Sequence, residues 1–238
     1  MPAHFITFEG GEGVGKTTQI ALLAKRLEDE MGADIVVTRE PGGSPRAEAL
    51  RELILSGAAE KYGPFAEAVL FNIARADHIA ELIVPSLEAG KTVICDRFMD
   101  STRVYQGVSG DIEPSIVRGL EEVAVGEVLP DLTLVLDIDA KTAMERAGVR
   151  RGDGAADRFE KEALDVQAKR RKAFRKLPED YSERCVLVDA RGDAEAVADR
   201  VWEAVTQRLF PADEILGDDA MARLDRAVAE LANTGADS

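Results

Sequence analysis

The stretch FITFEGGEGVGKT, residues 5–17, decides the fold of this 238-residue chain. An apolar run, Phe5–Glu9, precedes a glycine-rich loop, Gly10–Thr17, with the pattern G-x-x-x-x-G-K-[ST], and an amphipathic segment follows. Strand, glycine loop and helix in this order form the context of a P-loop, in which backbone N–H groups and a helix N-terminus surround phosphate oxygens. The sequence therefore predicts a site for a nucleotide phosphate chain.

Two side chains at the end of this loop have distinct expected roles. Lys16 should reach the β- and γ-phosphates, and the hydroxyl of Thr17 should ligate Mg²⁺. A plain glycine-rich turn is the structural alternative, which the strand–helix context disfavours. We expect the ATP-binding residues to be Gly10, Gly11, Glu12, Gly13, Val14, Gly15, Lys16, Thr17 and Thr18.

Beyond the loop, short apolar runs alternate with helical patterns, which is typical of βαβ units. The fold class is predicted to be α/β, a P-loop NTPase fold with a five-stranded parallel sheet, helices on both faces and a mobile lid. The predicted strands are Phe5–Glu9, Ile35–Thr38, Thr92–Asp96, Leu132–Asp137 and Cys185–Asp189. Helices are predicted near 16–31, 46–56, 65–89, 113–127, 140–147, 158–176 and 193–209.

Composition limits the partners of such a protein. With 30 basic and 45 acidic residues, the chain has a net charge of −15, which disfavours nucleic acid and anionic membranes as partners. Two cysteines exclude a disulfide scaffold, and no apolar run is long enough to span a bilayer. No secretion signal is recognisable at the start, so we expect a cytoplasmic protein.

Two regions depart from this average charge. Residues 141–176 contain twelve basic and six acidic residues, whereas residues 212–238 contain two basic and seven acidic ones. Within the acidic extension, apolar residues fall at helical spacing and predict a short amphipathic helix, with a frayed tail as the alternative. These apolar residues are Met221, Leu224, Val228 and Leu231.

Four further segments carry polar and aromatic residues, and three of them follow predicted strands. Ligands of open α/β sheets bind beyond the carboxyl ends of the strands, so we expect these segments and the P-loop to meet in one crevice. The four are TREPGG (38–43), FNIAR (71–75), DRF (96–98) and STRVYQG (101–107). In this order and spacing, FEGGEGVGKTTQ, TREPGG, DRF and STxxYQG resemble the thymidylate kinase family over about residues 3–209.

This resemblance implies a phosphotransferase that moves the γ-phosphoryl of ATP to dTMP, giving dTDP and ADP for dTTP synthesis, with Mg²⁺. It further implies that Glu12 faces the nucleoside sugar and an arginine, and that Arg97 holds the dTMP phosphate with Arg39 nearby. Asp96 would support the Mg²⁺ geometry together with Thr17. Alternatively, Asp96 and Arg97 could form a structural ion pair, and Arg39 could cap a strand end.

The same resemblance implies a pocket for the base and sugar. Phe71 would stack on thymine, Arg75 and Thr102 would hydrogen-bond to the base, and Tyr105 would lie against the 2′ carbon. Ser101 and Gln106 would complete the pocket. Phe71 could instead be core and Tyr105 could pack at a helix end, but a buried Arg75 needs an anionic or carbonyl partner.

Members of this family differ in the source of a catalytic arginine, which lies either in the P-loop after the acidic residue or in the lid. Here Gly13 occupies the loop position, so the basic lid segment, ERAGVRRGDG at 145–154 and DRFE at 157–160, is the expected source. A solvated basic loop is the alternative. The expected catalytic residues are Lys16, Arg97, Arg150, Arg151 and Arg158.

Together these expectations define a nucleoside-monophosphate kinase domain at 1–211, with a lid at about 146–158, and an acidic extension at 212–238. ATP and dTMP are the expected partners, and the resemblance implies a homodimer packed through the long apolar helices. A pyrimidine nucleoside-monophosphate kinase of looser specificity is one alternative. A non-catalytic P-loop switch or a P-loop ligase are others, although no N-K-x-D motif supports a GTPase.

Overall fold

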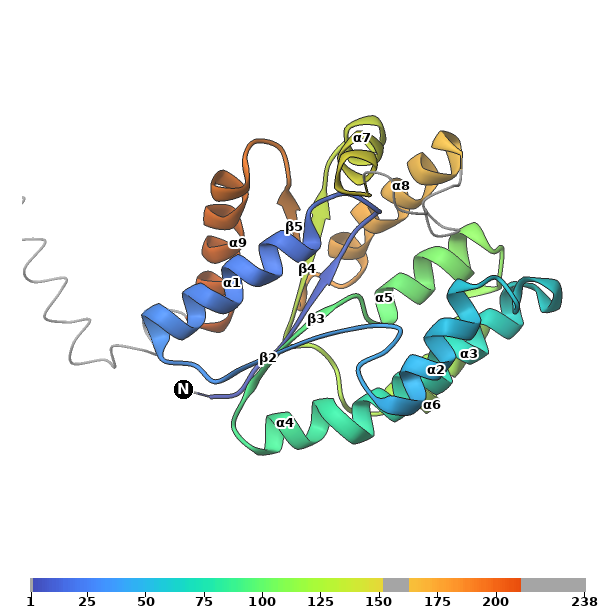
Figure 1. The fold of residues 1–238 in the computed structure, drawn as a ribbon, viewed down its shortest axis with the longest axis horizontal. Helices are drawn as coiled ribbons and strands as arrows, with labels where there is room; N and C mark the ends of the chain where they lie inside the picture. Colours follow the sequence, from blue (N-terminus) through green and yellow to red (C-terminus); the bar gives the residue numbers. More distant parts are fainter. Residues whose placement is uncertain (1, 152–162, 211–238) are drawn as a thin grey trace, which may run out of the picture.

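Five parallel strands form the central sheet of the computed structural model, which describes residues 2–151 and 163–210 (Figure 1). The strand order is β2-β3-β1-β4-β5. The five predicted strands are confirmed, although the second ends one residue later than predicted. Their bounds are β1 Phe5–Glu9, β2 Ile35–Arg39, β3 Thr92–Asp96, β4 Leu132–Asp137 and β5 Cys185–Asp189.

Burial of the strands follows their place in the sheet. All residues of β1 and nearly all of β3 and β4 are buried, as expected for strands covered on both faces. The edge strands β2 and β5 include exposed positions, such as Val37 and Leu187. The near-continuous apolar runs in the sequence thus belong to the interior of the sheet.

Nine α-helices and three helical turns of other types surround the sheet within the described residues. The α-helices are α1 Lys16–Met31, α2 Pro45–Leu55, α3 Gly63–His78, α4 Val84–Glu88, α5 Met99–Thr102, α6 Pro114–Val125, α7 Ala140–Arg151, α8 Leu164–Asp180 and α9 Ala194–Leu209. The turns are a 3₁₀ turn, η1 (Glu60–Tyr62), and two π-helical turns, η2 (Ile79–Ile83) and η3 (Arg103–Ser109).

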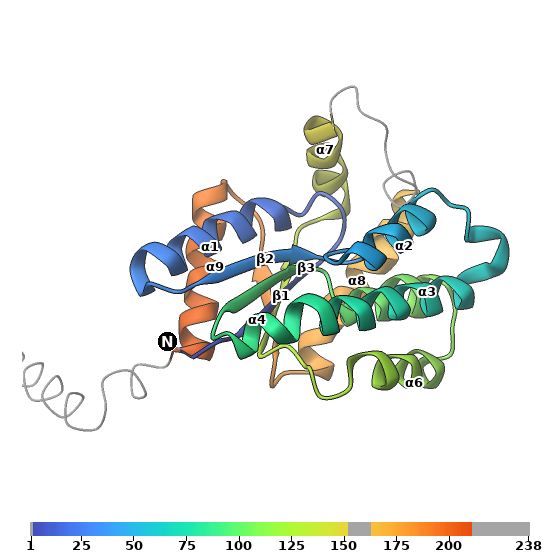
Figure 2. The same ribbon diagram turned by 60° about the horizontal axis from the view of Figure 1, so that its bottom comes forward.

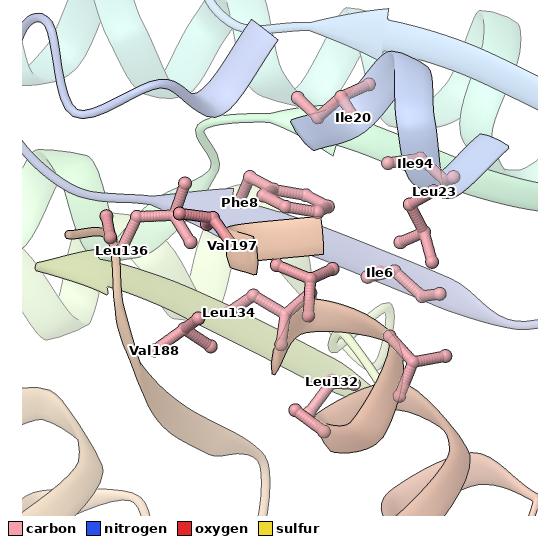
Figure 3. Close-up of a cluster of buried hydrophobic side chains, with 14 of the residues drawn as sticks. Ile6, Phe8, Ile20, Leu23, Ile94, Leu132, Leu134, Leu136, Val188 and Val197 are labelled. Carbon is pink, nitrogen blue, oxygen red and sulfur yellow. The ribbon is translucent and has the colours of Figure 1, made fainter. Parts of the chain in front are cut away.

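Helices cover both faces of the sheet, as predicted (Figures 1 and 2). On one face, α1 and α9 pack side by side, and their apolar residues meet β1 and β4 in the largest buried cluster (Figure 3). On the other face, η2, α4 and α8 bury the alternate residues of the same strands. Each strand therefore contributes side chains to two apolar layers, which fixes its register and the position of its carboxyl end.

The structure confirms a helical segment near 65–89, but it contains a π-helical turn that the sequence does not predict. The segment contains α3, η2 and α4. Pro85 lies in the first turn of α4 and has no N–H to donate to the preceding turn, and the chain widens into a π-helical turn immediately before it. The segment 99–109, for which no helix is predicted, forms α5 and η3.

Several predictions concern residues outside the described ranges. Arg158 and most of the expected lid, 152–158, lie there, as do the extension 212–238 with its expected helix and the domain boundary at 211. These stay predictions. Within the described residues, no helix is long and apolar enough to cross a membrane.

Candidate functional site

The P-loop connects β1 to α1 at the carboxyl edge of the sheet. Gly13 and Gly15 have φ angles of 76° and 103°, which glycine adopts without strain. A Cβ atom at Gly13 would lie 1.9 Å from the carbonyl oxygen of Ala143 in α7, so the loop passes directly against that helix. Gly15 caps α1 without a side-chain hydrogen bond, which leaves the first N–H groups of the helix available to an anion.

Lys16 is nearly buried at the start of α1. Its Nζ donates to the carbonyl oxygens of Gly11, at 3.1 Å, and Gly10, at 3.4 Å. Burial, together with the charge of Arg97, lowers the pKa of Lys16. The ammonium group is thus held at the mouth of the glycine loop, where the sequence places a phosphate ligand.

Thr17 and Asp96 are brought together as the sequence predicts. The Thr17 hydroxyl donates to Asp96 Oδ2 at 3.4 Å, and Asp96 Oδ1 is buried without a hydrogen-bond partner among the described residues. Oxygen donors of this kind suit a hard divalent cation. The described residues contain no group of three or more His, Cys, Asp or Glu that could hold a metal ion alone. A cation at Thr17 and Asp96 would take its other ligands from water or from a bound phosphate.

A cavity of about 330 Å³ opens beside the P-loop. Its walls come from the P-loop, the β2–α2 connection, α2, α3 and the segment from β3 to η3. All the residues that the sequence assigns to the second substrate line it, namely Glu12, Arg39, Phe71, Arg75, Arg97, Ser101, Thr102, Tyr105 and Gln106.

Arg97 lines this cavity and is held through both its backbone and its side chain. It has a left-handed backbone, with φ 70°, which is uncommon for a residue with a Cβ atom and typical of functional sites. Its Nη2 donates to Glu12 Oε1 at 2.5 Å, and its Nη1 donates to Gly10 O at 2.9 Å and Ser101 Oγ at 3.1 Å. Although burial opposes its charge, the Glu12 carboxylate raises the pKa of Arg97. The ion pair thus joins Arg97 to the P-loop rather than to Asp96, its alternative partner.

Arg75 is 1% exposed, yet it lines the cavity. Its Nε donates to Glu40 Oε2 at 2.8 Å, its Nη1 to Asn72 Oδ1 at 3.0 Å, and its Nη2 to Phe98 O at 3.2 Å and Thr102 Oγ1 at 3.0 Å. These bonds use four of the five N–H groups of a guanidinium. The fifth, on Nη1, has no partner among the described residues and is available to a ligand.

Sequence reasoning misses the group that holds Arg75. Glu40 is buried, and its second oxygen, Oε1, lies 3.1 Å from Nδ1 of His78, whose Nε2 lies 2.8 Å from Thr38 Oγ1. Glu40 belongs to the TREPGG segment and His78 lies three residues after Arg75 on α3, so both stand beside recognised positions. Other missed residues of the cavity wall are Pro41, Arg51, Leu55 and Phe98.

The remaining predicted residues differ in their exposure. Tyr105 is buried, its hydroxyl donates to Glu12 Oε1 at 3.0 Å, and burial raises its pKa, which keeps the donor proton in place. Phe71 is half-buried on α3 at the cavity wall, so it is not a core residue. Arg39 is exposed and donates to both oxygens of Glu48 at 3.1 Å, so its guanidinium is already paired at the cavity rim.

A second hollow, of about 380 Å³, lies on another side of the P-loop. Gly13 and Thr17 border both hollows. Arg146 of α7 lines the second one and donates to the carbonyl oxygens of Ala190 and Gly192, both at 3.1 Å. Both hollows therefore adjoin the P-loop. Arg150 and Arg151 are the last two residues of α7.

Glu9 ends β1 and is fully buried. Its Oε1 accepts from the backbone N–H groups of Phe98, at 2.8 Å, and Ser101, at 3.1 Å, and its Oε2 accepts from Ser101 Oγ at 2.6 Å. Burial, followed by the charge of Asp100, raises the pKa of Glu9 to about 7. Sequence reasoning counts Glu9 only as a strand residue.

We predict a pH-dependent stability difference between the wild type and Glu9→Gln. Below the ordinary carboxyl pKa of 4.5, the group is protonated in both states; as pH rises through about 7, the folded state retains its proton longer, so stability is lost. The full shift corresponds to about 3 kcal/mol. Urea unfolding from pH 5 to pH 8 should show the wild type losing stability relative to Glu9→Gln, whereas a constant difference would contradict the raised pKa.

Comparisons with known proteins agree with this geometry. A sequence profile of the family described as thymidylate kinase matches residues 8–201. The chain is 50% identical over 209 residues to a thymidylate kinase of Bradyrhizobium sp. (strain ORS 278), covering 88% of this chain and 92% of that protein. A thymidylate kinase of Nitrobacter hamburgensis is 50% identical over 213 residues, covering 90% of this chain and 92% of that protein.

A solved structure shows the same fold. The crystal structure of thymidylate kinase from Ehrlichia chaffeensis matches with a TM-score of 0.71 at 30% identity, covering 86% of this chain and 100% of that one. Profile, sequence identity and fold thus agree over the region that builds the P-loop and the cavity. The chain belongs to the thymidylate kinase family.

Proposed function

We propose that this chain transfers the γ-phosphoryl of ATP to dTMP, giving dTDP and ADP, with Mg²⁺. The observation that carries the proposal is the cavity beside the P-loop, whose wall contains two arginines. We assign Arg97 to the acceptor phosphate and Arg75 to the base. Membership of the thymidylate kinase family supports the choice of substrates. Because ATP and nucleoside monophosphates are cytoplasmic metabolites, we place the reaction in the cytoplasm.

In this proposal the two hollows beside the P-loop hold donor and acceptor. ATP would lie along the Arg146 side, with its phosphates over the loop and against Lys16. Thr17 and Asp96 would hold Mg²⁺, whose charge offsets that of the phosphate oxygens. dTMP would lie in the larger cavity with its phosphate at Arg97.

The chain needs no strong general base for this reaction. A phosphate monoester has a second pKa near 6, so the attacking oxygen is largely ionised at neutral pH. The barrier lies in bringing two polyanions together and in stabilising charge on the transferred group. Lys16 and Arg97, both fixed by hydrogen bonds to P-loop carbonyls, supply positive charge around that point.

We propose that the lid arginines supply further positive charge around the transferred phosphoryl group. Arg150 and Arg151 end α7, whose middle packs against Gly13 of the P-loop, so the helix leads from the phosphate site into the expected lid. Because a lid arginine acts mainly on the transition state, Arg150→Ala or Arg151→Ala should lower kcat by about 10³-fold or more and change KM less. Steady-state kinetics test this; an unchanged kcat in both variants would remove the assignment.

Base selectivity follows from the hydrogen bonds around Arg75. Its remaining N–H can only donate, and the hydroxyl of Thr102, which accepts from Arg75, has its own proton to donate. Two donors suit the carbonyl edge of thymine or uracil and oppose the amino group of cytosine. Arg75→Gln, which can also accept, should raise the relative use of dCMP by at least about tenfold. The measurement is the ratio of kcat/KM for dTMP and dCMP.

The function itself is tested by ADP release with ATP and Mg²⁺. We expect strong turnover with dTMP, weaker turnover with dUMP, little with dCMP or dGMP and none without an acceptor. Equal turnover of all pyrimidine nucleotides would favour a kinase of looser specificity. Nucleotide binding without acceptor-dependent turnover would favour a P-loop switch.

We also propose a homodimer. Exposed apolar side chains lie on the neighbouring helices α3 and α6, including Phe65 and Ile73 of α3, Ile116 of α6 and Val123, which is 89% exposed. Such a face is expected to be covered in a stable protein. Light scattering coupled to gel filtration should give a mass near twice 25.7 kDa.

A further inference from the structure

Glu9 lies behind the cavity and is absent from its wall. It is fully buried, and all three of its hydrogen bonds go to residues that follow β3. Two of these are bonds from backbone N–H groups, of Phe98 and Ser101, so the carboxylate fixes the course of the chain directly after Arg97.

Arg97 is held on its other side by the neighbouring residue of β1. The backbone N–H of Arg97 donates to Phe8 O at 2.9 Å, while Phe98 N donates to Glu9. Between these two attachments Arg97 has its left-handed conformation, which costs roughly 1–3 kcal/mol and persists only where surrounding contacts enforce it. The end of β1 supplies those contacts.

Ser101 connects Glu9 to the guanidinium itself. Its hydroxyl donates to Glu9 Oε2 and therefore presents lone pairs to Arg97 Nη1, which donates to it at 3.1 Å. At a pH above about 7, where Glu9 is ionised, its carboxylate only accepts and so sets the direction of this hydroxyl. An amide NH₂ in the same place would donate to Ser101 Oγ. The hydroxyl proton would then need a new acceptor, on the side that Arg97 occupies.

We propose that Glu9 is a positioning residue of the acceptor-phosphate site, which fixes Arg97 through Ser101 and the backbone at Phe98. The inference rests on the proposed function, because it assumes that Arg97 binds the phosphate of dTMP. None of these three hydrogen bonds goes directly to Arg75 or Phe71, and Glu9 reaches Arg75 only through the backbone of Phe98. We therefore expect the phosphate end of the acceptor to depend on Glu9 more than the base end does.

The test compares binding of dTMP and thymidine to the full chain by calorimetry, in the wild type and in Glu9→Gln, at about pH 8, where the wild-type Glu9 is mostly ionised. Thymidine shares the base and sugar but has no phosphate. We expect Glu9→Gln to weaken the binding of dTMP at least about tenfold and to change the affinity for thymidine by no more than about twofold. KM for dTMP should rise in parallel, while KM for ATP stays nearly constant. Ser101→Ala should act in the same direction, and the double variant should be no worse than Glu9→Gln.

Glu121→Gln is the matched control. Glu121 is also a buried carboxylate, but it lies on α6 and is paired with Arg103 at 2.8 Å. Its replacement should lower the melting temperature without changing the dTMP-to-thymidine affinity ratio. If Glu9→Gln leaves the ratio of the dTMP and thymidine affinities unchanged, the inference is overturned and the proposed function stays intact. This holds whether both affinities fall equally or neither falls. A wild type that neither binds nor phosphorylates dTMP would overturn both.

Discussion

Arg97→Lys is expected to lower kcat/KM for dTMP by about 10² to 10³, although it keeps the positive charge. Arg97 reaches Glu12, Gly10 O and Ser101 Oγ at once, through two nitrogens of one planar group. A lysine ammonium is a compact charge on a flexible stem and cannot hold that arrangement or bind phosphate in a bidentate manner. The loss should therefore exceed that expected from charge alone.

The melting temperature should fall in this variant, because lysine bears the same strain at φ 70° but cannot make all three hydrogen bonds of Arg97. Steady-state kinetics with dTMP varied at saturating ATP measure the effect. Arg118→Lys, at an exposed position of α6, is a suitable control and should behave as wild type. A change of less than about threefold in Arg97→Lys would show that Arg97 does not bind the acceptor phosphate.

Gly13→Ala is the second substitution with a large expected effect. The new Cβ would lie 1.9 Å from Ala143 O and 3.1 Å from the Cβ of Ala147, in a residue with φ 76°. The nearest atom belongs to the backbone of α7, so relief requires movement of the helix or of the P-loop. We expect a loss of roughly 2–4 kcal/mol in unfolding free energy and at least about a hundredfold weaker ATP binding.

Gly15→Ala separates the clash from the backbone strain. Gly15 also has a positive φ, of 103°, but no atom of the described residues lies within 4 Å of the point that a Cβ atom would occupy there. It should therefore lose stability through strain alone, and less than Gly13→Ala. Urea unfolding and calorimetric titration with ATP measure both variants. Equal destabilisation would mean that the contact with α7 contributes nothing.

The strands and the P-loop are predictable because they depend on local patterns, whereas the predicted residues of the cavity wall come from the family resemblance. Central strands are recognisable as apolar runs such as Thr92–Asp96. The glycines and the Lys-Thr pair of Gly10–Thr17 identify the P-loop without any distant residue. The π-helical turn before Pro85 and the α5–η3 segment are harder to predict, because their conformation depends on residues that are distant in the sequence and close in the fold. The start of α5, for example, is held by Glu9, 89 positions from Phe98.

The same reason explains why the supporting residues of the site escape prediction. Glu40 and His78 are ordinary polar residues in the sequence, and their roles exist only once α3 packs beside the end of β2. The directions of hydrogen bonds on Arg75 likewise depend on atoms from three separate segments. A motif identifies which residues meet a ligand, but not which residues hold them in place.

The close approach of α7 to Gly13 also restricts how this enzyme can evolve. An arginine within the P-loop at position 13 would require space that Ala143 O already occupies. Because α7 continues toward the expected lid, withdrawing it to admit that side chain would also move Arg150 and Arg151 at its end. If the lid supplies the catalytic arginine, an exchange of one arginine source for the other should therefore need linked substitutions in the loop and in the helix.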